Sequence, residues 1–291
     1  MKLTYDEIIH AKDIESIAKN ENVLPVNHDE VNRLLICIDV QNDFMDNGAL
    51  GVPGALKDVE NLTKWIYNNV DKIANIVYSL DTHTKNHIFF HDWWKDEEGN
   101  LVEPFTIITY ADVLNGKYSV VDEKNHDISL EYLKAIEANG KQLCIWPYHC
   151  IQNTEGAKLE KSLENILKWY SVVREKEVTE VVKGLLPDTE MYGIIHPEYN
   201  KVNYFNYEIL NRIENADEVY IAGEAASHCL LESLIQILDY FKERINICKK
   251  IVVLTDTTSA IGGYEEYSKD WFEKLILEYG ISLKKTTDLK F

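Results

Sequence analysis

The chain has 291 residues, of which 45% are hydrophobic, and its 49 acidic against 30 basic residues give a formal net charge of −19. That charge repels phosphate backbones and anionic lipid surfaces, which argues against nucleic acid or membrane partners but not against a small neutral substrate. No stretch approaches the roughly 18 uninterrupted apolar residues of a membrane span, and the first residues lack the apolar segment of a signal peptide. The five cysteines are odd in number and scattered, so no disulfide framework is expected and a reducing, cytoplasmic location is predicted.

Short apolar runs alternate with helix-like segments along the chain. The first 30 residues show helical spacing of isoleucines and are expected to form a helix on the outside of the domain. Near-continuous apolar runs, typical of strands buried on both faces, cover residues 33–40, 73–80, 142–146, 178–182, 218–222 and 250–254. Helices are predicted at 56–70, 229–241 and 265–279. This alternation predicts parallel βαβ units, and therefore an α/β fold in which helices cover both faces of a mostly parallel central sheet.

One segment, residues 88–140, breaks the alternation. It is rich in acidic residues, contains Gly99 and Gly116, and has a helix-like stretch at 128–138. We interpret it as an insertion or cap rather than a separate domain. The predicted organisation is therefore an N-terminal helical extension over residues 1–30 and one α/β domain over residues 31–291.

Cys229 is the candidate nucleophile. It ends the sequence GEAASHC and opens the apolar segment LLESLIQIL, at a junction between a predicted strand and a predicted helix. Backbone N–H groups at a helix N-terminus favour the thiolate, so a lowered thiol pKa is expected, and the same groups can hold an oxyanion during acyl transfer. The alternative for a single cysteine is a buried packing residue.

Two charged residues end other predicted strands. Asp39 closes the first predicted strand, and an acid there is costly to bury unless it is paired. Lys183 ends the run VTEVVK and could stabilise both a carboxylate and a thiolate. Because ligands of open parallel α/β sheets bind along the carboxyl ends of the strands, both side chains are expected near Cys229. Taken singly, Asp39 could be a turn cap and Lys183 a solvated lysine.

Three residues could hold a metal ion. Asp81 and His83 are two residues apart directly after a predicted strand, so both side chains point the same way. His149 follows the next predicted strand and should reach the same edge. Two histidines and a carboxylate suit one divalent ion, with Zn²⁺ favoured and Fe²⁺ or Mn²⁺ as alternatives. His87 and His91 could replace or join His83, and the sequence leaves this open.

Together the motifs resemble the nicotinamidase/isochorismatase-like cysteine hydrolase superfamily. The matching segments are IDVQNDF, DTHTKNH, WPYHC, VVKG and GEAASHC, and their order covers roughly residues 31–260. The resemblance implies the isochorismatase-like hydrolase fold over residues 31–291. It also implies a catalytic triad of Asp39, Lys183 and Cys229 and a metal bound by Asp81, His83 and His149.

Further roles follow only from the resemblance. A cis peptide expected at Ala225–Ala226 would shape an oxyanion hole formed by the backbone N–H groups of Ala226 and Cys229. A substrate pocket would be lined by Phe44, Trp146 and Tyr192. The chain departs from the family pattern at Asn153, where glycine is usual, at Ser227, where an acid is usual, and in the sequence YGII after the lysine.

The presence of both the cysteine and the metal ligands places the resemblance on the nicotinamidase side of the superfamily. The predicted function is a metal-containing cysteine amidohydrolase that converts nicotinamide to nicotinate and ammonia through a thioester. Alternatives are hydrolysis of another small amide or carbamoyl compound, selected by the insertion, or a catalytically silent binding module. Members of the superfamily often form oligomers, so a homo-oligomer is also considered, although no interface is evident in the sequence.

Overall fold

The computed structural model of the protein describes residues 2–289 and 291. Six parallel strands form the central sheet in the order β10-β9-β8-β1-β2-β7. Their bounds are β1 Arg33–Ile38, β2 Asn75–Asp81, β7 Thr179–Lys183, β8 Glu218–Gly223, β9 Ile251–Leu254 and β10 Ser282–Lys284. The predicted α/β fold with a parallel central sheet is therefore confirmed.

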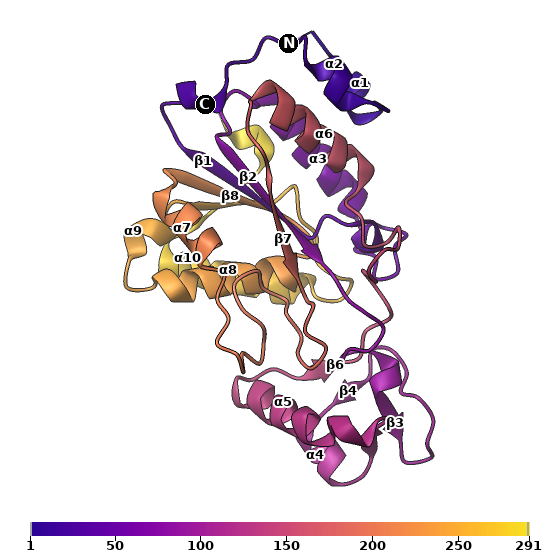
Figure 1. Ribbon diagram of the computed structural model, residues 1–291. Helices are drawn as coiled ribbons and strands as arrows, with labels where there is room; N and C mark the ends of the chain where they lie inside the picture. The colour runs from indigo at the N-terminus through magenta and orange to yellow at the C-terminus, as the bar shows by residue number, and fades with distance from the viewer. Residues whose placement is uncertain (1, 290) are drawn as a thin grey trace.

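Helices cover both faces of this sheet (Figure 1). One face packs against α3 (Ala55–Asn68) and α6 (Lys161–Val173), and the other packs against α7 (Tyr207–Asn215) and α8 (Cys229–Phe241). Side chains of β1 alternate between the two apolar cores, because successive residues of a strand point to opposite faces. The second face also carries α9 (Ile245–Cys248) and α10 (Glu265–Tyr279). Short 3-10 turns lie at Val26–His28, Asn42–Phe44 and Thr286–Asp288.

The N-terminal segment contains two short helices rather than one. They are α1 (Tyr5–Ile9) and α2 (Ile14–Ala18), and both pack against α6. The side chain of Asp13 accepts a hydrogen bond from the backbone N–H of Ser16 at 3.2 Å, which starts a new helix there. None of the helices in the described part of the chain has the length and apolar character needed to span a membrane.

The segment expected as an insertion forms a small lobe beyond the carboxyl ends of the central strands (Figure 1). Its elements are the turn His91–Trp93, β3 (Trp94–Asp96), β4 (Ile107–Ile108), α4 (Tyr110–Leu114), β5 (Tyr118–Val120), the turn Glu123–Asn125 and α5 (His126–Ala138). The short strand β6 (Leu143–Cys144), which follows the segment, completes the lobe. Two antiparallel pairs, β3 with β5 and β4 with β6, hold the lobe together.

One predicted strand was placed wrongly. The run at 142–146 was expected in the central sheet, but β6 has only two residues and pairs with β4 of the lobe. Its place as the sixth central strand is taken by β10, which pairs with β9 and was not predicted from the sequence. An apolar run predicts a strand but does not predict its partner, and a three-residue edge strand carries almost no pattern of its own.

Two glycines allow the chain to approach the edge of the sheet closely. Gly223 ends β8 with φ +107°, and a Cβ atom there would lie 2.1 Å from the carbonyl oxygen of Ile38. Gly184 follows β7 with φ +76°, and a Cβ atom there would lie 2.5 Å from His83 and 2.6 Å from Asp81. Only glycine fits these two positions, which lie next to the candidate functional side chains.

Candidate active site

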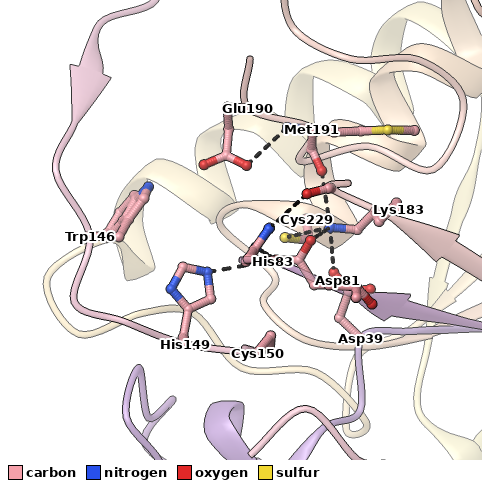
Figure 2. Close-up of polar contacts among 12 residues, drawn as sticks. Asp39, Asp81, His83, Trp146, His149, Cys150, Lys183, Glu190, Met191 and Cys229 are labelled. Carbon is pink, nitrogen blue, oxygen red and sulfur yellow. Dashed lines mark hydrogen bonds and ion pairs between the residues drawn. The ribbon is translucent and has the colours of Figure 1, made fainter. Parts of the chain in front are cut away.

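Four neighbouring strands deliver the candidate residues to one edge of the sheet. Asp39 directly follows β1, Asp81 ends β2 and Lys183 ends β7, while Cys229 begins the helix that follows β8. These strands are adjacent in the order β8-β1-β2-β7. The predicted residues therefore meet, as Figure 2 shows.

Lys183 lies at the centre of the cluster. Its Nζ is 2.9 Å from Asp39 Oδ2 and 2.9 Å from Asp81 Oδ1, and it donates to the carbonyl oxygen of Met191 at 3.0 Å. The same atom is 3.7 Å from Cys229 Sγ. Burial would lower the pKa of Lys183, but the two carboxylates outweigh burial and raise it well above its ordinary value. Lys183 is therefore protonated near neutral pH. Because the side chain is buried, the solvated alternative is wrong.

Asp39 is fully buried and held on both sides. Ser79 Oγ donates to its Oδ1 at 2.6 Å, and Lys183 faces its Oδ2. Burial raises the pKa of Asp39 above its ordinary value, although Lys183 opposes the shift. A carboxyl group with a raised pKa beside a thiol can accept and return a proton.

Cys229 is 7% exposed and lies at the first position of α8. Its Sγ and a carboxylate oxygen of Asp39 lie within 4.8 Å of each other. The expected lowering of its thiol pKa is not found. Burial raises the pKa of Cys229 well above its ordinary value, and this effect prevails although Lys183 opposes it. The resting thiol therefore needs a base to become a nucleophile.

The three predicted metal ligands lie together. Nε2 of His83 is 2.8 Å and Nε2 of His149 is 3.7 Å from Asp81 Oδ2, and all three side chains are buried. Nδ1 of His83 contacts the carbonyl oxygen of Gly184 at 2.9 Å, and Nδ1 of His149 contacts that of Pro147 at 2.9 Å. Each Nδ1–H therefore has an acceptor, which directs Nε2 of both rings at Asp81. Imidazoles oriented in this way are typical of metal ligands, so the donor set fits one divalent ion.

His149 reaches this site by a different route from the one expected. Its loop is tied to the end of β2 by backbone hydrogen bonds from His83 to Cys150 at 3.0 Å and from Gln152 to His83 at 2.8 Å. His87 contacts the carbonyl oxygens of Thr84 and Gly184, each at 2.9 Å, so both of its ring nitrogens are engaged. His91 packs against Tyr148 instead.

The predicted oxyanion hole requires a correction. The cis peptide is Glu224–Ala225, one residue before the expected position. The N–H of Ala226 donates to the carbonyl oxygen of Ser259 at 2.8 Å, so it is not free to bind a ligand. Within the described part of the chain, the N–H groups of Ala225 and Cys229 have no acceptor. These two groups, rather than those of Ala226 and Cys229, are available to an oxyanion.

A small cavity of about 20 Å³ opens beside Cys229. Its lining consists of Phe44, Leu50, Asp81, Trp146, His149, Glu190, Tyr192, Ala225, His228, Cys229 and Ile261. The three expected pocket residues, Phe44, Trp146 and Tyr192, are all present. Larger hollows lie along α6 and β7 and at the opposite end of the sheet, away from these groups. The cavity therefore offers an aromatic wall next to the thiol of Cys229.

Two polar residues of the cavity were missed from the sequence. Glu190 is 3% exposed, and burial together with Asp81 raises its pKa to about 7. His228 has a pKa lowered to about 4 by burial, so its ring is neutral near pH 7. His228 could have been found from its position directly before Cys229. Glu190 lies in a long loop, where no sequence pattern predicts that its side chain lines the cavity.

Two departures from the family pattern have local explanations. Asn153 has φ +65°, and asparagine tolerates this left-handed conformation better than most residues. Ser227 Oγ accepts from the N–H of Ile261 at 3.0 Å and lies 2.8 Å from Nδ1 of His228. Ser227 therefore fixes the orientation of the His228 ring on the cavity wall.

The turn before the nucleophile rests on the loop that follows β9. Besides accepting from Ala226, Ser259 donates its N–H to Glu224 Oε2 at 3.3 Å and its hydroxyl to Asp58 Oδ2 at 2.5 Å. Burial raises the pKa of Glu224 well above its ordinary value and that of Asp58 to about 6. The surroundings of Glu224 and Asp58 therefore favour the protonated form of both carboxyl groups.

Replacing Asp58 with asparagine is expected to stabilise the protein at high pH. The folded pKa of about 6 exceeds the ordinary 3.8, so the stability contributed by this group is present below pH 4 and is lost as pH rises through 6. Asp58→Asn removes that loss and should add about 1–2 kcal/mol to the free energy of unfolding at pH 8, with no gain at pH 3.5. Urea unfolding at both pH values measures this.

Asp46→Asn is the matched control with the opposite sign. Asp46 accepts from the N–H groups of Gly54 and Leu56 at 2.9 and 2.8 Å, which lower its pKa. Its substitution should therefore reduce stability at pH 8. Equal effects of the two substitutions at pH 8 would contradict the role assigned to Asp58.

Known proteins resemble this chain in sequence and in structure. The nicotinamidase of Escherichia coli (strain K12) is 25% identical over 228 residues, which are 77% of this chain and 81% of that protein. The yeast nicotinamidase Pnc1p, in its structure bound to the inhibitor nicotinaldehyde, aligns with a TM-score of 0.62 and 24% identity, covering 87% of this chain and 99% of that one. The zinc complex of Pyrococcus horikoshii pyrazinamidase aligns with a TM-score of 0.52 and 21% identity, covering 87% and 99%. No family model matches the chain.

These similarities identify the fold. The chain has the isochorismatase-like hydrolase fold seen in nicotinamidase structures. The resemblance to the nicotinamidase/isochorismatase-like superfamily, predicted from the motifs, is confirmed by the similarity to a nicotinamidase in sequence.

Proposed function

We propose that the protein is a metal-containing cysteine amidohydrolase that converts nicotinamide to nicotinate and ammonia. The observation that carries the proposal is the position of Lys183, whose Nζ contacts both Asp39 and Cys229, while Cys229 itself lines an aromatic cavity. Sequence similarity to a nicotinamidase supports this choice of substrate. A flat aromatic carboxamide matches the chemistry of a cavity lined by Phe44, Trp146 and Tyr192.

The first half of the reaction forms a thioester. Asp39 takes the proton of the Cys229 thiol, and the thiolate attacks the carboxamide carbon, so that a C–S bond forms. The backbone N–H groups of Ala225 and Cys229 hold the developing oxyanion. The C–N bond then breaks as Asp39 returns the proton to the leaving nitrogen, which departs as ammonia.

The second half releases the acid. Asp39 takes a proton from a water molecule, which attacks the thioester carbon, and the C–S bond breaks as the proton returns to sulfur. Lys183 stays protonated throughout and favours the anionic forms of Asp39 and Cys229. The intact set of these three residues argues against a catalytically silent binding module.

We propose that Asp81, His83 and His149 hold one divalent ion, with Zn²⁺ favoured over Fe²⁺ and Mn²⁺. Such an ion would supply a Lewis acid that binds the ring nitrogen of nicotinamide and so fixes the orientation of the ring. His83 and His149 would each hold it through Nε2, because both Nδ1 atoms face carbonyl oxygens.

Removing one of these ligands is expected to weaken metal binding. Purified protein should contain about one divalent ion per chain, and His149→Ala should lower the affinity for Zn²⁺ at least about tenfold in competition with a chromophoric chelator. His91→Ala is the control, since His91 packs against Tyr148 and should leave the affinity unchanged. Equal losses in both variants would contradict the assigned ligand set.

Ammonia release from nicotinamide by metal-replete protein tests the function. A panel of other small amides and carbamoyl compounds, tested in parallel, addresses the alternative substrates, because the inserted lobe meets the cavity wall at Trp146. Turnover of nicotinamide above the rest of the panel supports the proposal. Turnover of another compound alone would show that the same reaction acts on that substrate instead of nicotinamide. No turnover of any compound would favour a binding module.

We further propose that residues 31–291 act as one hydrolase domain, with residues 1–30 as an extension, in a reducing cytoplasmic setting. All five cysteines are unpaired in the structure, which supports a reducing environment. Sedimentation of the purified protein would test for a homo-oligomer.

A further inference from the structure

Phe105 of the inserted lobe occupies a position that disfavours its side chain. The segment Glu103-Pro104-Phe105-Thr106 forms a tight turn, in which the N–H of Thr106 donates to the carbonyl oxygen of Glu103 at 3.3 Å. Phe105 has φ +67°, so it stands where such a turn calls for glycine or asparagine after proline. The phenylalanine is also 60% exposed to solvent. Neither local backbone preference nor burial explains a large aromatic residue here.

The contact that Phe105 does make is with the wall of the cavity. Its ring centroid lies 6.1 Å from that of Trp146, with an interplanar angle of 89°. This edge-to-face arrangement is a favourable geometry for an aromatic pair. Trp146 lines the cavity beside Cys229 and is 4% exposed.

The backbone fixes this contact. The N–H of Phe105 donates to the carbonyl oxygen of Ile145 at 2.5 Å, and the N–H of Ile145 donates to that of Thr106 at 2.9 Å. These bonds extend the pairing of β4 with β6 up to the residue before Trp146. The turn is therefore attached directly to the residue whose ring it touches.

The side chain of Trp146 also contacts two residues of the hydrolase core. Its Nε1–H donates to the hydroxyl of Tyr192 at 3.0 Å, and its ring lies 5.4 Å from that of His228 at 84°. Phe105 adds a contact from the inserted lobe. Without the phenyl ring, the indole keeps its hydrogen bond but loses an aromatic neighbour.

We infer that Phe105 is a positioning residue that holds the Trp146 ring in place. Through this contact the inserted lobe contributes to the affinity of the cavity for an aromatic carboxamide. This inference rests on the proposed function and deepens it, because it assigns ring recognition partly to the lobe. Strained backbone conformations often persist where a function requires them, which agrees with a disfavoured residue retained at this position.

The test uses Phe105→Asn, because asparagine tolerates the left-handed conformation and only the ring is lost. Binding of nicotinamide is measured by calorimetry in a Cys229→Ala background, so that it does not depend on turnover. Phe105→Asn should weaken binding roughly three- to tenfold, the range of one aromatic pair. In otherwise unaltered enzyme it should raise KM by a similar factor and leave kcat within about twofold. The melting temperature should not fall, and Phe105→Tyr should restore affinity.

Leu114→Ala is the matched control. Leu114 is also 60% exposed and lies in α4 of the same lobe, but it has no part in the cavity wall. Its substitution should change neither binding nor KM. The inference fails if Phe105→Asn binds nicotinamide as Leu114→Ala does, or if it lowers the melting temperature and kcat together.

The proposed function is tested separately, by measuring ammonia release by the unaltered enzyme. If that enzyme binds nicotinamide without hydrolysing it, the comparison of Phe105→Asn with Leu114→Ala still decides the inference. If nicotinamide does not bind at all, the cavity is not a ring pocket, and the inference falls with the proposed function.

Discussion

Replacing Cys229 with alanine is expected to abolish ammonia release from nicotinamide. The thiol is the nucleophile of the proposed reaction, and loss of a nucleophile that acts with its base typically lowers kcat by about 10⁴-fold or more. The side chain is small, so the variant should fold and should still bind metal. Steady-state kinetics with metal-replete protein, together with a metal analysis, measures both effects.

Cys248→Ala controls for the loss of a buried thiol. Cys248 lies in α9 within the apolar core and takes no part in the cavity. This variant should therefore keep its turnover, although it should lose some stability. Near-normal turnover by Cys229→Ala would exclude the thiolate route and would point to a metal-bound hydroxide as the nucleophile.

Replacing Lys183 with methionine is expected to lower both the free energy of unfolding and the rate of turnover. The substitution removes the cation that lies 2.9 Å from each of two buried carboxylates, Asp39 and Asp81. Removing one partner of a buried ion pair typically costs about 3–5 kcal/mol, because the remaining charge is left uncompensated. Turnover in the folded fraction should fall by about 10³-fold or more, since neither Asp39 nor the thiolate keeps its counter-charge. Urea unfolding and kinetics measure the two losses.

Lys141→Met separates the two effects. Lys141 also lies between two carboxylates, those of Glu198 and Glu232, but outside the cavity. Its substitution should lower stability and leave kcat near that of the unaltered enzyme. If the two lysine variants lost activity to the same extent, Lys183 would have only a structural role.

The local pattern of the sequence was enough to bring the main candidates together. Asp39, Asp81, Lys183 and Cys229 each follow an apolar run, and parallel strands deliver such residues to one edge of a sheet. The pattern failed where an element was short. The two residues of β6 and the three of β10 are too few to specify a partner, so one strand was placed in the wrong sheet and another was missed.

Other features depend on neighbours that are distant in the chain. The N–H of Ala226 is taken by Ser259, which moves the free donors to Ala225 and Cys229. No local pattern predicts that hydrogen bond. The pKa of Cys229 was expected to fall because of its place at a helix start, but burial among carboxylates raises it.

The sequence by itself determined the α/β class, the edge of the sheet that carries the site, and the residue types gathered there. These follow from periodicity and from the strand–turn–helix order, which are local properties of the chain. The tertiary structure alone decided which side chains surround the cavity, including Glu190, His228 and the contact of Phe105 with Trp146. Burial, pKa shifts and hydrogen-bond partners arise from packing between segments far apart in the chain, and a one-dimensional pattern does not contain them.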